Sequence, residues 1–482
     1  MDRREFLKGT AWMGAAAFAA GCHLNRLGLG EGGQMQNFAY RKLMGKRIRV
    51  GFVGIGGRGT AAVHRVSMIP GIDIVALCDN RQCQVDENLA WLREQNYPGV
   101  DKIRTYVGDE AYKDLCDFGD CDVVYCATPW ALHQPVGLRA LFGGKIAFIE
   151  VTSALTVDQC WELVEASEKL QIPCMQLENC VYGEIELLEL HLARLGKFGE
   201  INHVEGGYIH DLRGIIPQTV HNNTEWKWRY AENMAHRGDR YPTHGLVPLC
   251  QTLGINRGDR LDYLVSLGSG FGNKNYERVR REFLSDTDSR KYDPPAEMAE
   301  MNSTLIKTVN GVSILVQHDV SSPRPYDRKA LISGTKGVMG AYPFRCAFED
   351  KCMDGRAHHW FNQKMADEVR KEYMHPMWRD VSEVAKKVGG HGGMDFIMDL
   401  RWAYCLQNGE PLDMDVYDLA ATSCLCELTE TSDRSGSKPQ SIPDFTRGNW
   451  RNVKPWGIVN VDLKKMGLDK SGVTKDNAAM SV

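Results

Sequence analysis

A glycine-rich turn at residues 54–59 constrains this chain more than any other segment, and it reads Gly-Ile-Gly-Gly-Arg-Gly. An apolar, β-rich run at 48–54 leads into the turn, and residues 60–68 continue with helical apolar spacing. Asp79 stands 20 residues after Gly59, at the end of the next apolar run. A strand, this turn, a helix and an acidic residue at that distance are the fingerprint of a dinucleotide-binding βαβ unit.

Each part of the fingerprint has a physical task in binding a dinucleotide. The glycines let the backbone approach the pyrophosphate, whose charge the helix N-terminus stabilises. A carboxylate at the position of Asp79 accepts hydrogen bonds from ribose hydroxyls and repels a 2′-phosphate, which favours NAD; the nearby Arg81 could soften this preference. The predicted cofactor contacts in this unit are Gly54, Gly56, Gly57, Arg58, Gly59 and Asp79.

Apolar runs and helical patterns go on alternating to about residue 178. Further strands are predicted near 121–128, 145–151 and 172–177, with helices at 82–95, 133–142 and 157–170. Strands that alternate with helices of this length predict an α/β fold with a doubly wound parallel sheet. The sequence therefore predicts an NAD-binding Rossmann domain at 48–178.

Two segments with polar side chains fall at the carboxyl ends of these strands, where open parallel sheets bind ligands. Residues 127–133 read Ala-Thr-Pro-Trp-Ala-Leu-His, and residues 148–152 read Phe-Ile-Glu-Val-Thr. His133 is either a cofactor contact or simply a residue at the start of a helix. The cofactor contacts predicted at this edge are Thr128, Trp130, His133, Glu150, Val151 and Asn179.

The N-terminal segment has the pattern of an export signal. Arg3 and Arg4 precede a short apolar stretch at 11–20, which ends at Gly21 and Cys22. A basic start followed by a short apolar core is typical of a signal peptide, here residues 1–21, and a linker at 22–47 follows. An ordinary amphipathic segment is the alternative interpretation.

This signal resembles two known types. Paired arginines followed by Phe-Leu-Lys are similar to a twin-arginine signal, whose receptor passes folded proteins. The residues at 20–22 are similar to a lipoprotein cleavage site, although Ala19 stands where such sites usually have leucine, so lipidation of Cys22 is left open. The sequence thus predicts an exported protein that is periplasmic or lipid-anchored at the cell envelope.

Composition and charge limit the classes of partner. The 482 residues, 43% hydrophobic and 25% charged, can bury a large core divided into two or more domains. A formal net charge of −4 gives no reason to expect nucleic acid or an anionic membrane as a partner. The 15 cysteines show no zinc-ligand spacing, and no metal is predicted. Membrane contact is expected only through an anchor at Cys22, and homo-oligomerisation is left open.

The order of the motifs in the first domain carries a family resemblance. The fingerprint, Asp79, Thr128-Pro129 with His133, and Glu150 resemble the glucose–fructose oxidoreductase/inositol dehydrogenase (Gfo/Idh/MocA) family. This resemblance implies that an α+β domain with an open, mainly antiparallel sheet follows the Rossmann domain, here at 179–450, with a tail at 451–482. Most of the family has Glu-Lys-Pro where this chain has Glu-Val-Thr at 150–152, and the lysine usually assists proton transfer. Its replacement argues against an ordinary sugar dehydrogenase.

Motifs in the second domain narrow the resemblance. The ordered segments that carry it lie at 177–183, 208–213, 241–245, 256–260, 322–326 and 390–395. Together they resemble glycoside hydrolase family 109, the NAD-dependent α-N-acetylgalactosaminidases, over about residues 48–450. The stretch 214–240 departs from the family pattern except at Trp228-Arg229.

The resemblance implies hydrolysis of terminal, α-linked N-acetylgalactosamine by a redox cycle. The C3 hydroxyl is oxidised, the acidified C2 proton and the aglycone leave, water adds, and C3 is reduced again. Ordinary glycosidases use two carboxylates instead. Because the cycle has no net redox change, NAD is expected to stay tightly bound and to be recycled in each turnover, as an enzyme exported away from the cytoplasmic cofactor pool requires.

Residue chemistry at the matched positions suggests roles. His244 is predicted to take the O3 proton, because imidazole titrates near neutrality. Tyr182 is predicted to remove the C2 proton, which requires a lowered phenol pKa. Glu150 is expected to hold the nicotinamide ribose or to share proton transfer. The predicted sugar contacts are Arg229, Tyr241, Thr243, His244 and Tyr326.

Several interpretations stay open at this point. An exported NAD(P)-dependent sugar oxidoreductase of the Gfo/Idh/MocA type is the main alternative, and a lipid-anchored carbohydrate-binding protein with a structural NAD is the other. His210 and Asp211 could form a polar site, or Asp211 could simply pair with Arg213. The glycine-rich run at 389–393 predicts either close backbone approach to the sugar or a flexible turn.

Overall fold

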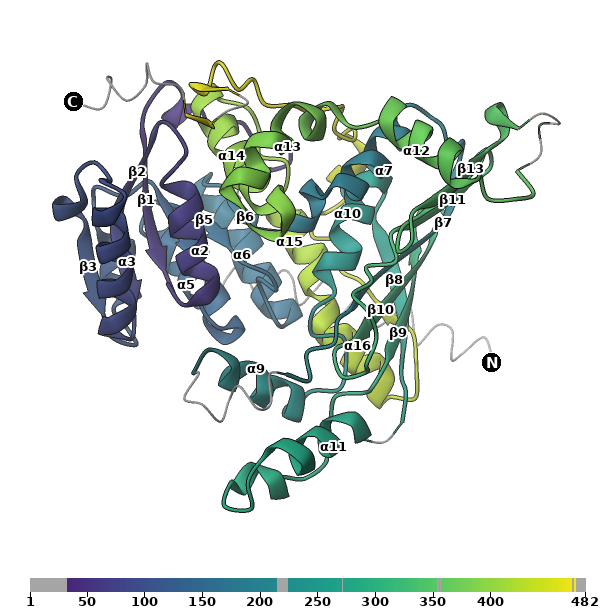
Figure 1. Cartoon of the computed structure of the whole chain (residues 1–482), viewed down its shortest axis with the longest axis horizontal. Helices are drawn as coiled ribbons and strands as arrows, with labels where there is room; N and C mark the ends of the chain where they lie inside the picture. Colours follow the sequence, from purple (N-terminus) through teal and green to yellow (C-terminus); the bar gives the residue numbers. More distant parts are fainter. Residues whose placement is uncertain are drawn as a thin grey trace.

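The computed structural model describes residues 33–214, 224–270, 272–352, 355, 357–469 and 472–473. The predicted signal peptide and Cys22 lie outside the described residues. Two sheets stand at opposite sides of the molecule, with a layer of helices between them (Figure 1). None of the described helices has the length and apolar character needed to cross a membrane.

The first sheet confirms the predicted Rossmann fold. Its six strands are all parallel and follow the order β3-β2-β1-β4-β5-β6. The strands are β1 (Ile48–Val53), β2 (Ile72–Asp79), β3 (Arg104–Val107), β4 (Val123–Cys126), β5 (Ile146–Ile149) and β6 (Cys174–Gln176). The helices of this domain are α2 (Gly57–Val66), α3 (Gln82–Glu94), α4 (Tyr112–Asp117), α5 (Trp130–Phe142) and α6 (Val157–Leu170).

Strand β3 and helix α4 were not predicted, and burial explains why. β3 is an edge strand of four residues, and none of its side chains is fully buried. A strand without a buried face carries no apolar run or alternation, which are the signals that reveal strands in a sequence. Helix α4 has only six residues, too few for a periodic pattern.

The second sheet is mixed and mostly antiparallel, as predicted. Its eight strands follow the order β13-β12-β11-β7-β10-β9-β8-β14, and only β7 and β10 run parallel to each other. The strands are β7 (Ile201–Ile209), β8 (Leu261–Gly268), β9 (Asn302–Thr308), β10 (Ser313–Asp319), β11 (Leu331–Gly334), β12 (Gly337–Gly340), β13 (Arg345–Phe348) and β14 (Gln440–Ser441). A short hairpin, β15 (Leu468–Asp469) and β16 (Gly472–Val473), lies in the tail.

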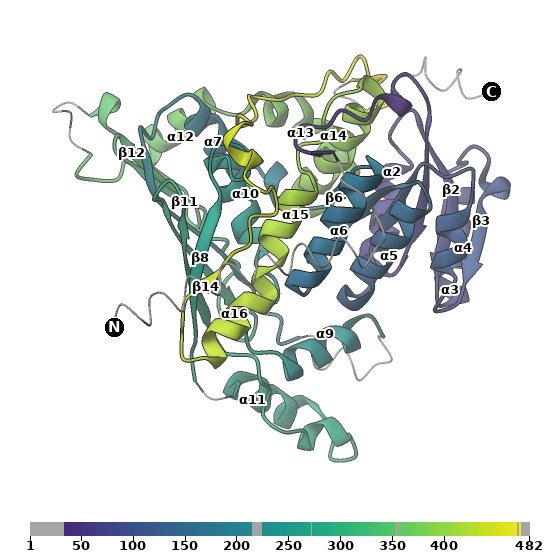
Figure 2. The same ribbon diagram turned by 180° about the vertical axis from the view of Figure 1, so that it is seen from behind.

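Helices fill the space between the sheets and extend below it. Those of the second domain are α7 (Glu184–Arg194), α9 (Thr224–Ala235), α10 (Thr243–Leu253), α11 (Lys274–Phe283), α12 (Gln363–Glu372), α13 (Pro376–Val388), α14 (Met394–Asn408), α15 (Val416–Ser423) and α16 (Leu425–Arg434). Short 3₁₀ turns are η1 (Arg41–Leu43), η2 (Val100–Lys102), η3 (Asn179–Tyr182), η4 (Ser289–Tyr292), η5 (Glu349–Lys351), η6 (His391–Gly393) and η7 (Asn449–Arg451). Helices α9 and α11 project together at one end of the molecule in both views (Figures 1 and 2).

Helix α14 belongs to the second domain by sequence but packs against the Rossmann sheet. The ring of its Trp402 lies 5.0 Å from that of Phe148 on β5, and Asp399 accepts a 2.8 Å hydrogen bond from Arg65 on α2. Buried side chains from both domains consequently form one continuous cluster. The boundary predicted near residue 178 separates the two domains along the sequence, but their side chains pack into one core.

The described parts of the linker and of the tail are docked on the domains. Met35, Tyr40 and Leu43 are buried, and the Met35 amide donates to the hydroxyl of Tyr417 on α15 at 3.2 Å. In the tail, residues 461, 466 and 468 bury their apolar side chains. The fourteen cysteines among the described residues are all free thiols, and most are buried.

Candidate active site

One cavity of about 600 Å³ runs along the carboxyl ends of the Rossmann strands. Its walls come from the ends of β1, β2, β4 and β5, and from β7, α9, α10 and the glycine-rich loop before α14. The predicted site residues that line it are Gly54, Gly56, Arg58, Asp79, Thr128, Trp130, His133, Glu150, Val151, Asn179, Arg229, Tyr241 and His244. Gly57, Gly59, Tyr182, Thr243 and Tyr326 do not.

The fingerprint end of the cavity fits a dinucleotide. A Cβ on Gly59 would lie 1.9 Å from the Gly54 carbonyl oxygen, so that only glycine lets α2 start this close to β1. Helix α2 begins at the cavity without a side-chain cap, so its N-terminal dipole would stabilise a phosphate placed there. Asp79 is held in place because its Oδ2 accepts from the Ile55 amide and its Oδ1 from the Arg81 amide, both at 3.0 Å.

We expect Asp79→Asn to weaken NAD binding about tenfold. The variant loses the charged acceptor for the ribose hydroxyls, and a hydrogen bond to a charged group contributes about 1.5 kcal/mol to binding. The measurement is the dissociation constant of NAD from protein stripped of cofactor, by calorimetry. Asp86→Asn, an exposed carboxylate on α3 outside the cavity, is the control. Unchanged affinity in Asp79→Asn would show that this carboxylate does not hold the ribose.

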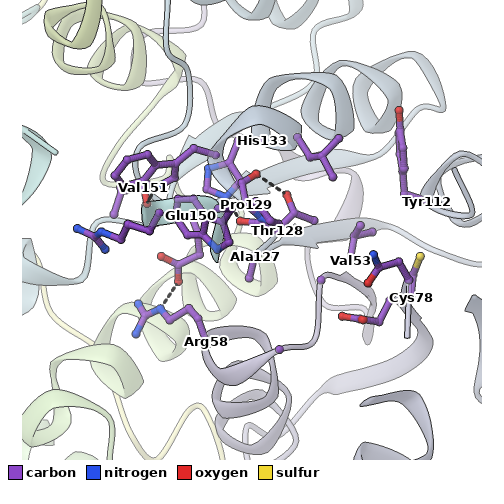
Figure 3. A pocket seen from close by; sticks show the side chains of 18 of the residues that line it. Val53, Arg58, Cys78, Tyr112, Ala127, Thr128, Pro129, His133, Glu150 and Val151 are labelled. Carbon is purple, nitrogen blue, oxygen red and sulfur yellow. Dashed lines mark hydrogen bonds and ion pairs between the residues drawn. The ribbon is translucent and has the colours of Figure 1, made fainter. Parts of the chain in front are cut away.

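Glu150 at the end of β5 is ion-paired with the fingerprint helix. The Arg58 Nε donates to Glu150 Oε1 at 2.6 Å, and Figure 3 shows the pair at the wall of the pocket. Val151, which directly follows this glutamate, carries no charge. The positive charge beside Glu150 is thus supplied by Arg58, from a different segment of the chain.

His133 joins the two loops at the cofactor's edge. Its Nδ1 lies 2.7 Å from the Thr152 carbonyl and its Nε2 2.7 Å from the Thr128 carbonyl (Figure 3). Burial lowers the pKa of this imidazole to about 4, although both carbonyls oppose that change; a neutral ring donates to one of the two carbonyls. His133 therefore lines the cavity and also fixes the loops that follow β4 and β5.

Aromatic rings surround an arginine at the other end of the cavity. The Arg229 guanidinium carbon lies 4.8 Å from the Tyr241 ring centroid, 5.0 Å from Trp130 and 5.9 Å from Tyr208. The Arg229 side chain is buried, and its Nε has no hydrogen-bond partner. A desolvated guanidinium with donors to spare, among aromatic faces, is suited to a polar, ring-shaped ligand such as a sugar.

His244 sits at the start of α10, held by a buried carboxylate. Its Nδ1 lies 2.8 Å from Glu178 Oε1 and 2.9 Å from Oε2, and Glu178 is completely buried. Burial alone would raise the pKa of Glu178, but the His244 charge and the Cys180 amide lower it. The ring's Nε2 lies 3.4 Å from the Tyr241 hydroxyl, at the cavity wall.

Glycines bring α10 into contact with β7. A Cβ on Gly245 would lie 2.1 Å from the Gly207 amide nitrogen, so the helix and the strand touch backbone to backbone. This contact places His244 beside Tyr208, with 5.3 Å between the ring centroids. The Tyr208 hydroxyl in turn lies 2.9 Å from Nδ1 of His210.

A three-residue group could be mistaken for a metal site. Ligand atoms of Glu178, Cys180 and His244 lie within 4.8 Å of one another, the one such group among the described residues. The carboxylate and the imidazole are already hydrogen-bonded to each other. Burial also raises the pKa of the Cys180 thiol well above its usual range, whereas a metal ligand must be a thiolate.

Comparisons with known proteins agree with this architecture. A family model for the NAD-binding Rossmann fold of the Gfo/Idh/MocA oxidoreductase family matches residues 48–176. A model described as the C-terminal domain of glycosyl hydrolase 109 matches residues 182–452. The chain belongs to glycosyl hydrolase family 109. It is therefore a family 109 enzyme with a nicotinamide-cofactor type of Rossmann domain.

Curated relatives extend this similarity over nearly the whole length. Glycosyl hydrolase family 109 protein 2 of Shewanella sp. (strain MR-4) is 42% identical over 471 residues, which cover 95% of this chain and 99% of the relative. Glycosyl hydrolase family 109 protein 1 of Bacteroides thetaiotaomicron is 44% identical over 422 residues, or 84% and 86% of the two chains.

Solved structures share the fold at low identity. Levoglucosan dehydrogenase in complex with NADH and levoglucosan superposes with a TM-score of 0.60 at 17% identity, over 82% of this chain and 100% of that one. Scyllo-inositol dehydrogenase from Lactobacillus casei gives a TM-score of 0.55 at 13% identity, over 83% and 99%. These similarities show the two-domain fold of this family 109 chain.

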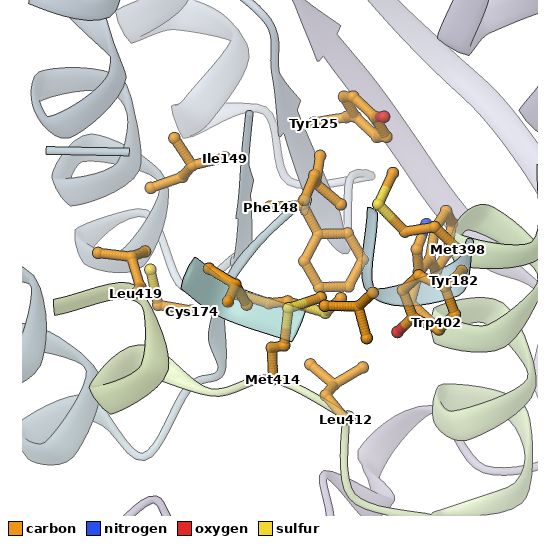
Figure 4. Close-up of a cluster of buried hydrophobic side chains, with 14 of the residues drawn as sticks. Tyr125, Phe148, Ile149, Cys174, Tyr182, Met398, Trp402, Leu412, Met414 and Leu419 are labelled. Atoms are coloured by element: carbon orange, nitrogen blue, oxygen red, sulfur yellow. The ribbon is translucent and has the colours of Figure 1, made fainter. Parts of the chain in front are cut away.

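Tyr182 is not in the cavity, which contradicts its predicted role as the base at C2. Figure 4 places it among core side chains beside Trp402 and Met398, and it is 1% exposed. Its hydroxyl donates to Asp413 Oδ2 at 3.0 Å. Burial and the Asp413 charge also raise its pKa well above the usual range. Tyr182 thus packs in the core of this chain, away from the cavity.

We accordingly expect Tyr182→Phe to leave kcat and KM close to those of the wild type. Loss of the buried hydrogen bond to Asp413 should lower the free energy of unfolding by about 1 kcal/mol, measured by urea denaturation. A large drop in kcat at unchanged stability would show that Tyr182 takes part in the reaction after all.

Besides Tyr182, four predicted residues lie off the wall of the cavity. Gly57 and Gly59 belong to the first turn of α2, and Gly59 serves helix–strand packing. Thr243 is completely buried beneath His244 in α10. The Tyr326 ring lies 4.9 Å from that of His210, and its hydroxyl accepts from Arg328 at 3.1 Å. Sugar contacts by Thr243 and Tyr326 stay predictions.

Three titratable residues at the Arg229 end of the cavity, which we call the sugar end, were not predicted from the sequence. Tyr208, His210 and His391 all line the cavity. Tyr208 and His210 lie in one of the motifs that carried the family resemblance, but neither was given a catalytic role. Their alternation along β7 was the available signal, because residues i and i+2 of a strand share a face. His391 lies in the glycine-rich loop, where the prediction considered only the backbone.

Proposed function

We propose that this chain hydrolyses terminal, α-linked N-acetylgalactosamine through oxidation at C3, elimination, hydration and reduction. One observation carries the proposal: Tyr208 and His244 share the sugar end of a cavity whose other end fits a dinucleotide. Among the described residues that line this cavity, Glu150 is the one carboxylate at the sugar end, and it is paired with Arg58. A pair of free carboxylates, as ordinary glycosidases use, is not found there.

NAD, when bound, supplies the hydride acceptor and donor for C3. The residues that would hold it are those of the fingerprint, Asp79 and the segments after β4 and β5. His244 is placed to accept the O3 proton as C3 is oxidised, since its Nδ1 is fixed on Glu178 and its Nε2 faces the cavity. The proton gained by His244 then stabilises negative charge on the C3 oxygen when C2 is deprotonated.

Tyr208 replaces Tyr182 as the group that removes the C2 proton. Its hydroxyl lies 2.9 Å from Nδ1 of His210, and burial together with the Arg229 and His244 charges lowers the pKa of that imidazole. Burial raises the pKa of Tyr208, and the charge of Arg229 opposes this rise. The phenol thus has a base at one side and a cation at the other.

His391 is placed to give a proton to the departing aglycone. Its side chain is 62% exposed at the mouth of the cavity, and its Nδ1 is bonded to Asp395, which leaves Nε2 for the ligand. Elimination of an alkoxide is slow without a proton donor, and imidazole is suited to that task near neutral pH. The same group can take a proton from water in the hydration step.

We further propose that NAD stays bound through every turnover and that the enzyme acts outside the cytoplasm. Return of the hydride leaves the cofactor in its starting state, so no external NAD is consumed. The paired arginines near the N-terminus support export in the folded, cofactor-loaded state.

The test uses protein purified without added NAD, in deuterated water, on nitrophenyl α- and β-glycosides of N-acetylgalactosamine, N-acetylglucosamine and galactose. We expect aglycone release from α-N-acetylgalactosaminide with deuterium at C2 of the product. Hydrolysis without deuterium at C2 would contradict the elimination route. A single burst of NADH without hydrolysis would favour a net sugar oxidoreductase instead.

A further inference from the structure

The glycine-rich loop before α14 has a backbone that few sequences can adopt. The φ angles of Gly389, Gly390, Gly392 and Gly393 are all positive, from 74° to 106°. His391, in the middle, also has a positive φ of 46°. A non-glycine residue in this region is strained, so other contacts must hold it there.

The contacts come from one buried carboxylate, that of Asp395 in the first turn of α14. Its Oδ2 accepts from His391 Nδ1 at 2.9 Å and from Arg58 Nη1 at 2.8 Å. Its Oδ1 accepts from the side-chain amide of Asn179, and Arg65 Nη1 lies 3.5 Å from Oδ2. Asp395 is 1% exposed, whereas the imidazole that it holds is largely in solvent.

The loop is shaped to fit this carboxylate. A Cβ on Gly390 would lie 2.6 Å from the Asp395 Cβ and 2.7 Å from its Oδ2, so the backbone at 390 passes directly over the side chain. The Gly393 amide closes the turn by donating to the Gly390 carbonyl at 2.9 Å. Any side chain at 390 would displace Asp395 or the loop.

The Asp395 carboxylate is ionised, so it can accept hydrogen bonds from several partners at once. Burial alone would raise its pKa, but the charges of Arg58 and Arg65 and the bond from His391 lower it far below its usual range. The carboxylate is therefore charged at any working pH. Asp395 thus orients His391 through a carboxylate that is also paired with Arg58.

Arg58 connects this arrangement to the cofactor site. The same guanidinium that pairs with Asp395 also pairs with Glu150, and it belongs to the glycine turn of the fingerprint. A chain of direct contacts thus runs from the turn expected to hold the pyrophosphate, through Arg58 and Asp395, to His391.

We propose that Asp395 is a positioning residue, which fixes His391 over the departing aglycone and aligns it with the cofactor turn through Arg58. This inference rests on the proposed function, in which His391 protonates the aglycone. Substitution of Asp395 should then harm substrates whose aglycone needs a proton and spare those whose aglycone leaves readily.

The experiment compares two α-N-acetylgalactosaminides, one with an alkyl aglycone and one with a nitrophenyl aglycone. We expect Asp395→Asn to lower kcat/KM about 10- to 100-fold on the alkyl glycoside and less than about threefold on the nitrophenyl glycoside. His391→Gln should show the same selectivity with a larger loss, about 10²- to 10³-fold on the alkyl glycoside. The double variant should be no worse than His391→Gln alone.

Asp399→Asn is the matched control. Asp399 lies one turn further along α14, is fully buried, and accepts from Arg65 at 2.8 Å, but the structure gives it no contact with His391. Both asparagine variants should lower the melting temperature, measured by scanning calorimetry on the cofactor-loaded protein. Only Asp395→Asn should discriminate between the two aglycones.

The outcomes distinguish the proton-donor role of His391 from the positioning role of Asp395. If His391→Gln affects both aglycones equally, His391 is not the proton donor and the proposed function loses that step. If His391→Gln discriminates but Asp395→Asn does not, or if the two losses multiply in the double variant, the positioning role of Asp395 is wrong. Equal discrimination by Asp399→Asn would also overturn it.

Discussion

Tyr208→Phe should abolish nearly all hydrolysis, with kcat reduced by about 10²- to 10⁴-fold, the usual contribution of a group that transfers a proton in the transition state. The ring and its packing against Tyr241 would remain, with only the hydroxyl bonded to His210 removed. KM should change little, because the sugar contacts that we propose for Arg229 and the aromatic rings are kept. The measurement is steady-state kinetics on the nitrophenyl glycoside.

Isotope exchange makes this prediction specific to the C2 step. With Tyr208→Phe, sugar incubated in deuterated water should acquire deuterium at C2 more slowly by the same factor as kcat falls. Oxidation at C3 precedes this step, so the variant should accumulate bound NADH on addition of substrate, visible by its absorbance. Tyr182→Phe is the matched control, since it removes a buried phenol hydroxyl outside the cavity. Normal exchange in Tyr208→Phe would refute its role as the base.

Glu178→Gln should lower kcat by about 10³- to 10⁴-fold. A carboxylate in this position holds the catalytic imidazole in the tautomer whose free nitrogen can accept a proton. An amide can donate to Nδ1 as well as accept from it, so Glu178→Gln allows the ring to turn its N–H toward the substrate oxygen. Glu178→Asp should restore part of the activity, because it restores the acceptor and its charge.

The pH profile supplies a readout that misfolding would not produce. Contacts with His244 and the Cys180 amide lower the pKa of Glu178, so this carboxylate is charged throughout the assay range. Its negative charge lies 2.8 Å from His244 Nδ1, so we expect its removal to move the acid limb of kcat to lower pH. Glu189→Gln, on α7, is the control, because this carboxyl is equally buried but lies outside the cavity. An unmoved limb in Glu178→Gln would contradict the orienting role.

Much of the cofactor half was predictable because its signals are local. A strand, a glycine turn and Asp79 follow one another within a single βαβ unit, and the segments after β4 and β5 must lie at its carboxyl edge. The cavity accordingly includes His133, Glu150 and Val151. β3 was the exception in this domain, since an exposed edge strand has no apolar pattern to detect.

The sugar half was less predictable because its residues come from separate segments. Tyr182 and Tyr208 are both tyrosines beside motifs of the family, and nothing local distinguishes a buried phenol from one on a cavity wall. The difference arises from Trp402 and Asp413, more than two hundred residues later, which enclose Tyr182 in the core. Likewise, the partner of Arg58 at Asp395 is 337 residues away.

The sequence by itself determined that this chain has a dinucleotide-binding Rossmann domain followed by an open-sheet domain of family 109 type, because periodicity and short motifs are local. Only the tertiary structure decided which titratable groups act together. The contact of Gly245 with Gly207 brings His244 to Tyr208, and α14 packs against α2 so that Asp395 reaches Arg58 and His391. Such pairings follow from how the two sheets and the helices between them are packed, and packing depends on the whole chain at once.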